Sequence, residues 1–464
     1  MNKTFENPLG YEKISTLLKR FALPSIISML VSSLYNIVDQ IFIGWGVGTI
    51  GNGATNVAFP FTSIMLAISL TIGVGAAAKF SLELGRGNKR EAGQTVGVAT
   101  VWGAVFGLLC FAVFELFTTP MLKAFGATPT IMPYALDYVR VTAVGMPFLI
   151  VSNSISNLIH ADGNPRYSMM SMLIGAVLNT ILDPIFIFVF HMGIAGAAWA
   201  TVISQIISFF VCVAYIPRFK CVAITRDTFR PSFKMTLRTM SLGLSNGLNQ
   251  VAVCLVQIVM NNSLTHYGAL TPYGTDIPLS AVGVVMKVNA IIMAVFIGIQ
   301  QGTRPIMGYN YGAKQYDRVK QTYKLGIAVD VAVALVGFIL FEFFPEYVLL
   351  LFGKDDEPLY MEFAVLFMRV FLSTVIINGI QFLSANFFSS IGKPLKGVML
   401  SMSRQCILFI PLILILPRLW NLGLTGILIA GPIADIIAVI ISIIFVFFEF
   451  RNMTKLKLME KNNA

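Results

Sequence analysis

The sequence predicts an all-α polytopic membrane protein with twelve transmembrane helices in two six-helix lobes, related by a parallel pseudo-two-fold repeat. Three observations lead to this fold class. Of the 464 residues, 56% are hydrophobic and only 12% are charged. Apolar stretches of about 20 residues, enough to cross a bilayer, recur along the chain. The two halves of the sequence also align with each other.

The internal repeat is the most informative of these observations. Residues 69–88 align with residues 296–315, and the aligned pairs continue into the last span of each half. Their separation grows only from 227 to 230 residues, so few insertions distinguish the copies. Because each half has an even number of spans, both copies cross the membrane in the same direction and are parallel repeats. The pairs include Gly75 with Gly302, Gly85 with Gly312, Gln94 with Gln321, Arg140 with Arg369, Gly163 with Gly392, and Gly193 with Gly423.

The first lobe and its cytoplasmic linker are expected to occupy residues 1–230. Its spans are expected near 21–45, 54–82, 92–117, 131–159, 167–190 and 195–216. The first span is long and follows a stretch with both charge signs, which indicates a permanent anchor and not a removable signal. Pro24 lies early in this span and can bend it, because proline removes a backbone donor.

The second lobe is expected to occupy residues 231–464. Its spans are expected near 239–265, 279–303, 325–345, 359–390, 395–416 and 424–450. Residues 268–278 are extra in its first outer connection and contain Pro272, Gly274 and Pro278, which predicts a longer outer loop.

The distribution of basic residues predicts the orientation. The tails and even-numbered connections hold nearly all Lys and Arg outside the spans, whereas the odd-numbered connections hold only Lys123, Lys354 and Arg418. By the positive-inside rule, both termini are cytoplasmic. The distribution of the net charge of +11 therefore indicates that the protein interacts with the lipid bilayer and not with nucleic acid.

Motif searches exclude several classes of protein. There is no phosphate-binding P-loop, and the G-x-S-x-G match at residues 243–247 lies in an apolar span with no strand before it. The three histidines fall at different span ends, and the five cysteines lack zinc-ligand spacing. We expect no enzymatic activity, no cofactor and no metal site.

Two acids inside spans are the leading candidates for function. Asp39 lies late in the first span and Asp183 late in the fifth, at a similar depth. A carboxylate at the bilayer centre costs about 2.5–3.5 kcal/mol on insertion scales, so its presence calls for a reason. Asn36 and Tyr35 precede Asp39 by three and four residues, and Asn179 precedes Asp183 by four, so each acid has polar neighbours on its own helical face. The matching helices of the second lobe contain no acid, which assigns the proton or cation site to the first lobe.

Other polar residues inside spans are candidates for a substrate cavity between the lobes. Lys287 has no acid in its own span, and one hypothesis is that it pairs across the lobes or with Asp435. Arg140 is expected to pair with Asp137, one turn before it. The cavity candidates are Asn36, Gln205, Lys287, Gln300, Gln301 and Asp435, with Gln205 standing opposite Asp435 in the repeat.

The chain resembles the multidrug and toxic compound extrusion (MATE) family, in particular its MepA-like bacterial branch. The duplicated twelve-span plan, the Gln301-Gly302-Thr303-Arg304-Pro305 segment with the Gly308–Ala313 segment (GYNYGA) after it, and Leu182-Asp183-Pro184 carry the resemblance.

The resemblance implies a secondary exporter of amphipathic, often cationic drugs, acting by antiport with H⁺ or, as the second option, Na⁺. It places the chain as a multi-pass protein of the bacterial cell (inner) membrane, functional as a monomer. In proton-coupled members, acids of the first and fifth helices line the cavity of the first lobe. Asp39 and Asp183 match these acids, with Tyr35, Asn179 and Thr201 as polar neighbours, and Pro24 matches the proline at which the first helix bends.

Two other functions are weighed against antiport. A flippase for a lipid-linked sugar or similar amphiphile could share the two-lobe plan, but a strongly basic central cavity would be expected of it. A channel is disfavoured because nothing resembles a selectivity filter.

Overall fold

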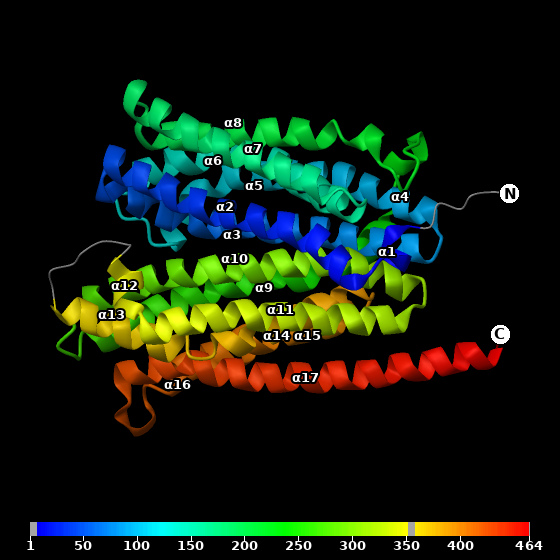
Figure 1. The fold of residues 1–464 in the computed structure, drawn as a ribbon. Helices are drawn as coiled ribbons and strands as arrows, with labels where there is room; N and C mark the ends of the chain where they lie inside the picture. The colour runs from blue at the N-terminus through cyan, green and yellow to red at the C-terminus, as the bar shows by residue number, and fades with distance from the viewer. Residues whose placement is uncertain (1–6, 351–357, 464) are drawn as a thin grey trace.

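The computed structural model describes residues 7–350 and 358–463, and the regular structure of this part is entirely helical. Eleven of its helical spans are long and apolar enough to cross a membrane, and one bent helix pair makes a twelfth. These twelve spans follow the predicted order and form two lobes that lie side by side (Figure 1). The predicted fold class is confirmed.

The first lobe follows a short helix, α1 (Pro8–Tyr11). Two π-helical segments interrupt its helices, Val98–Trp102 between α4 and α5 and Ile185–Val189 directly after Asp183 and Pro184. Its helices are α2 (Ile14–Val47), α3 (Thr49–Gly85), α4 (Lys89–Gly97), α5 (Gly103–Ala124), α6 (Met132–Ala161), α7 (Pro165–Pro184) and α8 (Gly193–Val213).

The second lobe contains the remaining helices. A third π-helical segment, Ser403–Phe409, joins α15 to α16. The helices are α9 (Phe233–Gly268), α10 (Asp276–Gly312), α11 (Tyr316–Phe343), α12 (Pro345–Leu350), α13 (Pro358–Phe371), α14 (Val375–Ser390), α15 (Pro394–Met402), α16 (Ile410–Ile415) and α17 (Gly423–Asn463).

The tenth span is broken, whereas the sequence predicts one continuous helix over 359–390. Helices α13 and α14 meet at an angle of 51°. The break is a turn in which the Val375 amide donates to the Leu372 carbonyl. Thr374 in this turn donates its hydroxyl to Asp435 Oδ2 on α17 over 2.7 Å. The break is therefore fixed by a long-range polar contact, which no local sequence signal reveals.

The linker between the lobes is fastened to the first lobe by one carboxylate. Asp162, just after α6, accepts hydrogen bonds from the backbone amides of Lys220 and Cys221 and from the Tyr215 hydroxyl. Burial raises the pKa of Asp162, while these donors lower it. The chain between α8 and α9 is thus held against the end of α6.

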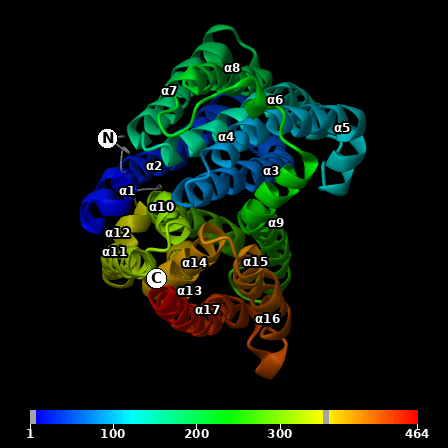
Figure 2. The same ribbon diagram turned by 90° about the vertical axis from the view of Figure 1, so that its right-hand side faces the viewer.

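Each lobe has apolar cores of its own. In the first lobe, one core packs α3, α5 and α6 around Phe61 and Phe114, and a second packs α3, α6 and α8 around Phe80. In the second lobe, the largest core lies around Phe363 and Phe367. Because most of the residues in each of these cores belong to one lobe, each lobe can behave as one packed body. Figure 2 shows the two bundles end-on, with α2 and α3 of one facing α9 and α10 of the other.

The seam between the lobes is built from small residues. Glycines on α3, α9 and α10 bring helix backbones together at positions where a side chain would not fit, for example Gly75 against the Thr239 carbonyl and Gly312 against the Leu82 carbonyl. All such cross-lobe approaches in the described residues lie in the half of the bundle where α2 begins and α17 ends, here named the terminal end. The lobes are therefore tightly joined at the terminal end.

Candidate ion site and the seam between the lobes

The fold brings Asp39 and Asp183 together, although 144 residues separate them in the sequence. Helix α2 packs against α7, and the two carboxyl groups lie close enough to interact with each other electrostatically. Asp183 is fully buried, and no donor of the described residues contacts Asp183 Oδ2 or Asp39 Oδ1. Two carboxyl groups can share a hydrogen bond only when a proton lies between them. The pair is thus a chemically suitable proton site.

Asn179 links this pair to α8. Its side-chain amide donates to Asp183 Oδ1 over 3.3 Å and to Thr201 Oγ1 over 3.2 Å. Asn179 is buried, and its own Oδ1 has no donor among the described residues. The site therefore offers several acceptor oxygens without donors, from Asp39, Asp183 and Asn179. Oxygen ligands of this kind also suit a hard cation.

Two tyrosines border the acids. Tyr35 interacts electrostatically with both Asp39 and Asp183, as the sequence predicts from its position four residues before Asp39. Tyr138 on α6 does the same and was not predicted as a site residue. A tyrosine inside an apolar span more often serves packing, so no signal in the sequence separates Tyr138 from the other tyrosines.

The structure does not gather the expected cavity residues into one pocket. Asn36 is exposed and donates to the Ser32 carbonyl of its own helix over 2.7 Å, not to Asp39. Gln205 lies inside the first lobe against Gly145 of α6, and its Oε1 is buried without a donor.

The hypothesis that Asp435 pairs with Lys287 is wrong. Asp435 Oδ1 accepts a bond from Arg404 Nε at 2.6 Å, within the second lobe, and Lys287 is exposed. The predicted pairing of Arg140 with Asp137 is also wrong, because Arg140 pairs with Glu115 of α5 at 3.8 Å. In both cases the partner comes from another helix, which spacing along one helix cannot show.

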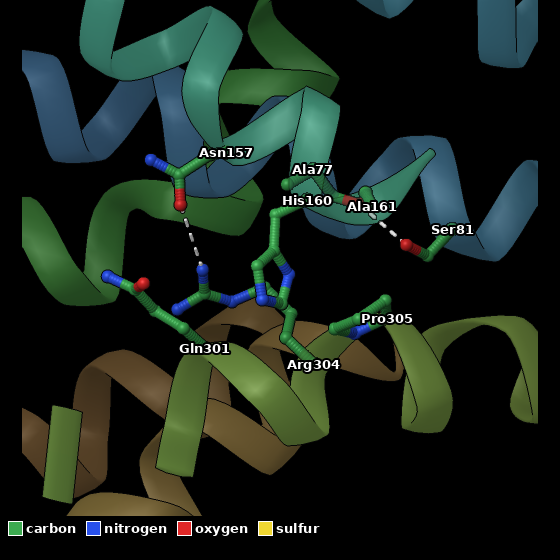
Figure 3. A pocket seen from close by; sticks show the side chains of 8 residues that line it. All are labelled: Ala77, Ser81, Asn157, His160, Ala161, Gln301, Arg304 and Pro305. Atoms are coloured by element: carbon green, nitrogen blue, oxygen red, sulfur yellow. Dashed lines mark hydrogen bonds between the residues drawn. The ribbon is translucent and has the colours of Figure 1, made fainter. Parts of the chain in front are cut away.

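The seam contains a polar cluster around Arg304 (Figure 3). Arg304 of α10 is buried and bridges the lobes, because its Nε donates to Asn386 Oδ1 at 3.0 Å and its Nη1 to Asn157 Oδ1 of α6 at 3.4 Å. His160, one turn after Asn157, lies beside a cavity of about 10 Å³, room for roughly one water molecule. Gln301 is the one expected cavity residue that lines it.

This cluster also reaches the turn of α2 that contains Pro24. His160 Nε2 lies 2.8 Å from Ser25 Oγ and 3.1 Å from the Phe21 carbonyl oxygen. Helix α2 runs without a break through Pro24 here, from Ile14 to Val47. Gln301 adds a weaker cross-lobe contact to Met29 Sδ at 3.7 Å. The seam thus contacts α2 where a proline leaves its hydrogen-bond ladder incomplete.

Comparison with known proteins agrees with this architecture. The family model named MatE matches residues 24–185 and 246–415. Multidrug export protein MepA of Staphylococcus aureus (strain MSSA476) is 26% identical over 430 residues, covering 92% of each chain. Probable multidrug resistance protein YoeA of Bacillus subtilis (strain 168) is 24% identical over 438 residues, covering 93% of this chain and 92% of that protein.

A similar fold is also present among solved structures. The crystal structure of MATE in complex with MaL6 superposes with a TM-score of 0.89 at 22% identity. The match covers 98% of this chain and 100% of that one.

Proposed function

The chain belongs to the MatE family, and from this membership we propose that it is a multidrug exporter of the bacterial cell membrane that expels amphipathic or cationic compounds in exchange for H⁺. The relatives named as multidrug export and resistance proteins support export as the overall activity. The Asp39–Asp183 pair is the single observation that carries the coupling to protons. The orientation with both termini in the cytoplasm and the action as a monomer belong to the same proposal.

The proposed exchange cycle alternates between a state in which the lobes are joined at the terminal end and a state in which this end is open. With the terminal end closed, the pair Asp39–Asp183 takes up a proton from the outside, and drug leaves to the outside. Opening of the terminal end then lets the proton leave to the cytoplasm and admits new drug. A ligand drives such a cycle only if it binds one of the two states more tightly. A proton between Asp39 and Asp183 meets this requirement if a bend of α2 at Pro24 separates the two acids.

We assign substrate binding to the space between the lobes at the end of the bundle opposite the terminal end. Tyr35, Asn179 and Thr201 are proposed to supply polar contacts around the acids. Aromatic and methionine side chains suit varied apolar ligands because they adapt their packing.

Transport by the purified protein in proteoliposomes tests the proposal. Ethidium movement is measured with an H⁺ gradient or a Na⁺ gradient imposed separately. We expect the H⁺ gradient to drive ethidium accumulation and a proton uncoupler to abolish it. Accumulation driven by Na⁺ alone would reassign the coupling ion. Translocation of a lipid-linked headgroup without ion-driven ethidium transport would replace the proposal with a flippase.

A further inference from the structure

A buried acid in the second lobe is not used by the site described above. Asp330 lies midway along α11 and is 1% exposed. Neither of its carboxylate oxygens has a hydrogen-bond partner among the described residues. Midway along a spanning helix is the depth at which an ionised carboxylate is most costly. A carboxyl group in such a place lowers its free energy by binding a proton.

The other buried acids of the second lobe are compensated. Asp435 is paired with Arg404 and accepts a hydroxyl from Thr374. Glu449 on α17 is paired with Lys393 and with Lys396. Asp330 is thus the one buried acid in the described part of this lobe with no cation beside it. Charge pairing explains the other two acids and does not explain Asp330.

The internal repeat shows that the fold does not need a polar group at this position. By the spacing of the repeat, Asp330 corresponds to Gly103 and Gly379 to Ile150. In the first lobe, Gly103 packs against Ile150 and Val151, an entirely apolar contact. In the second lobe the arrangement is reversed. The glycine of the pair, Gly379, lies on α14, and the Asp330 side chain on α11 fills the space beside it. The distance from Asp330 Cβ to a Cβ added at Gly379 would be only 2.7 Å.

Among the described residues, no charged group on the surrounding helices is found to interact with Asp330. Helix α14, which holds Gly379, has no ionisable residue. Tyr323, two turns earlier on α11, interacts with Asp330 electrostatically, and its hydroxyl bonds Ser384 Oγ at 2.8 Å. Several other ionisable groups on helices packed against α11 are engaged elsewhere or exposed. They include Arg304 with Asn157 and Asn386, Asp435 with Arg404, Glu449 with Lys393 and Lys396, Arg369 with the Glu342 carbonyl, Glu362 with Tyr273, Tyr35 beside Asp39, and Lys19, Arg20 and Lys287 at exposed positions.

From these observations we propose that Asp330 is a second proton-binding site, located in the second lobe and loaded in the conformation described here. The inference rests on the proposed function, because its proton joins the same exchange cycle. In loading, one carboxylate oxygen of Asp330 forms an O–H bond with a proton taken from hydronium, which leaves as water. In release, that O–H bond breaks and the proton returns to water.

The broken tenth span provides the movement that exchange requires. Gly379, the residue against Asp330, lies in the second turn of α14, directly after the 51° break. The break is held by the hydrogen bond from Thr374 to Asp435. A change of this angle moves Gly379 away from Asp330 and admits water to the carboxyl group. Loading of Asp330 is thereby tied to the shape of the second lobe.

Infrared difference spectroscopy reads the proton on Asp330 directly, without any transport. The background is the double variant Asp39→Asn/Asp183→Asn, which removes the paired acids of the candidate ion site. We expect a C=O stretching band of a protonated carboxyl group at neutral pH that disappears on addition of Asp330→Asn and is lost reversibly as the pH is raised. The matched control is Asp317→Asn, which removes an exposed acid of the same helix that pairs with Lys457, and it should leave the band unchanged.

Transport then tests whether this proton is exchanged. In proteoliposomes, Asp330→Asn in the otherwise unaltered chain should lower the number of protons moved per ethidium by about half, because one of two linked proton sites is lost. Asp317→Asn should not change the ratio. An unchanged ratio in Asp330→Asn, or a spectrum without a band assignable to Asp330, would overturn the proposal. If the unaltered protein does not transport ethidium, the proposed function fails, and the reversible loss of the band with pH still decides whether Asp330 exchanges a proton.

Discussion

Gly302 of α10 lies directly against the backbone of Ala22 on α2. A Cβ added at Gly302 would be 2.6 Å from both the Cα and the N of Ala22. One turn earlier on the same helix, Gly298 meets Ile26 in the same way. Since Pro24 lies between Ala22 and Ile26, these two glycines contact α2 closely on either side of its proline. The closed seam depends on the absence of side chains at these points.

Gly302→Ala is therefore expected to weaken closure of the seam. The added methyl group meets backbone atoms that cannot rotate away, and overpacking of this kind costs about 1–3 kcal/mol. We expect ethidium transport to fall by about tenfold at equal amounts of protein in the membrane, because 1.4 kcal/mol corresponds to a factor of ten in a conformational equilibrium. Gly283→Ala on the same helix is the control, because an added Cβ there meets no atom within 4 Å. Equal transport by both variants would contradict the role assigned to the seam.

Asp39→Asn and Asp183→Asn are each expected to abolish drug resistance while insertion into the membrane stays normal. An amide in place of either carboxyl group cannot bind and release the shared proton. Minimum inhibitory concentrations and membrane abundance are the measurements. Asp137→Asn, an exposed acid of α6, should behave as the unaltered protein. Resistance at the unaltered level in both site variants would refute the assignment.

The buried pair Arg404–Asp435 should affect stability because each charge compensates the other. Asp435→Ala leaves the Arg404 guanidinium buried without its partner, which we expect to cost about 3–5 kcal/mol in thermal unfolding of the detergent-solubilised protein. The double variant Arg404→Met/Asp435→Asn removes both charges and keeps an acceptor for Thr374, so it should recover most of the loss. Arg140→Met, in the exposed pair with Glu115, should cost at most about 1 kcal/mol. A double variant no more stable than Asp435→Ala would show that the charges themselves stabilise the fold.

Cys221 in the linker should react slowly with maleimides. Burial and, after it, the Asp162 carboxylate raise the pKa of the Cys221 thiol to about 12. A raised pKa means less thiolate near neutral pH, and the thiolate is the reactive form, so we expect labelling about a hundredfold slower than in the denatured chain. Asp162→Asn removes one cause of the shift and should accelerate the labelling, as followed by mass spectrometry. A rate equal to that of the denatured chain would show that the linker is not held at Asp162.

Sequence reasoning succeeded where the signal is local. A residue four positions from another shares its helical face, which is why the placement of Tyr35 and Asn179 beside the acids was predicted correctly. It failed for Arg140 and Asp435, whose partners come from other helices. Prediction from the sequence also missed Tyr138 and Asp330, because an isolated polar residue in an apolar span gives no information about its surroundings.

The number and order of the spans, the two-lobe repeat and the family can be predicted from the amino-acid sequence, since hydrophobic length and internal alignment are properties of the chain alone. Tertiary structure alone decided that Asp39 meets Asp183, that Arg304 bridges the lobes and that the tenth span breaks at Thr374. These contacts depend on which faces of separate helices pack together, and helix packing is set by side-chain shape across the whole bundle and not by any one segment.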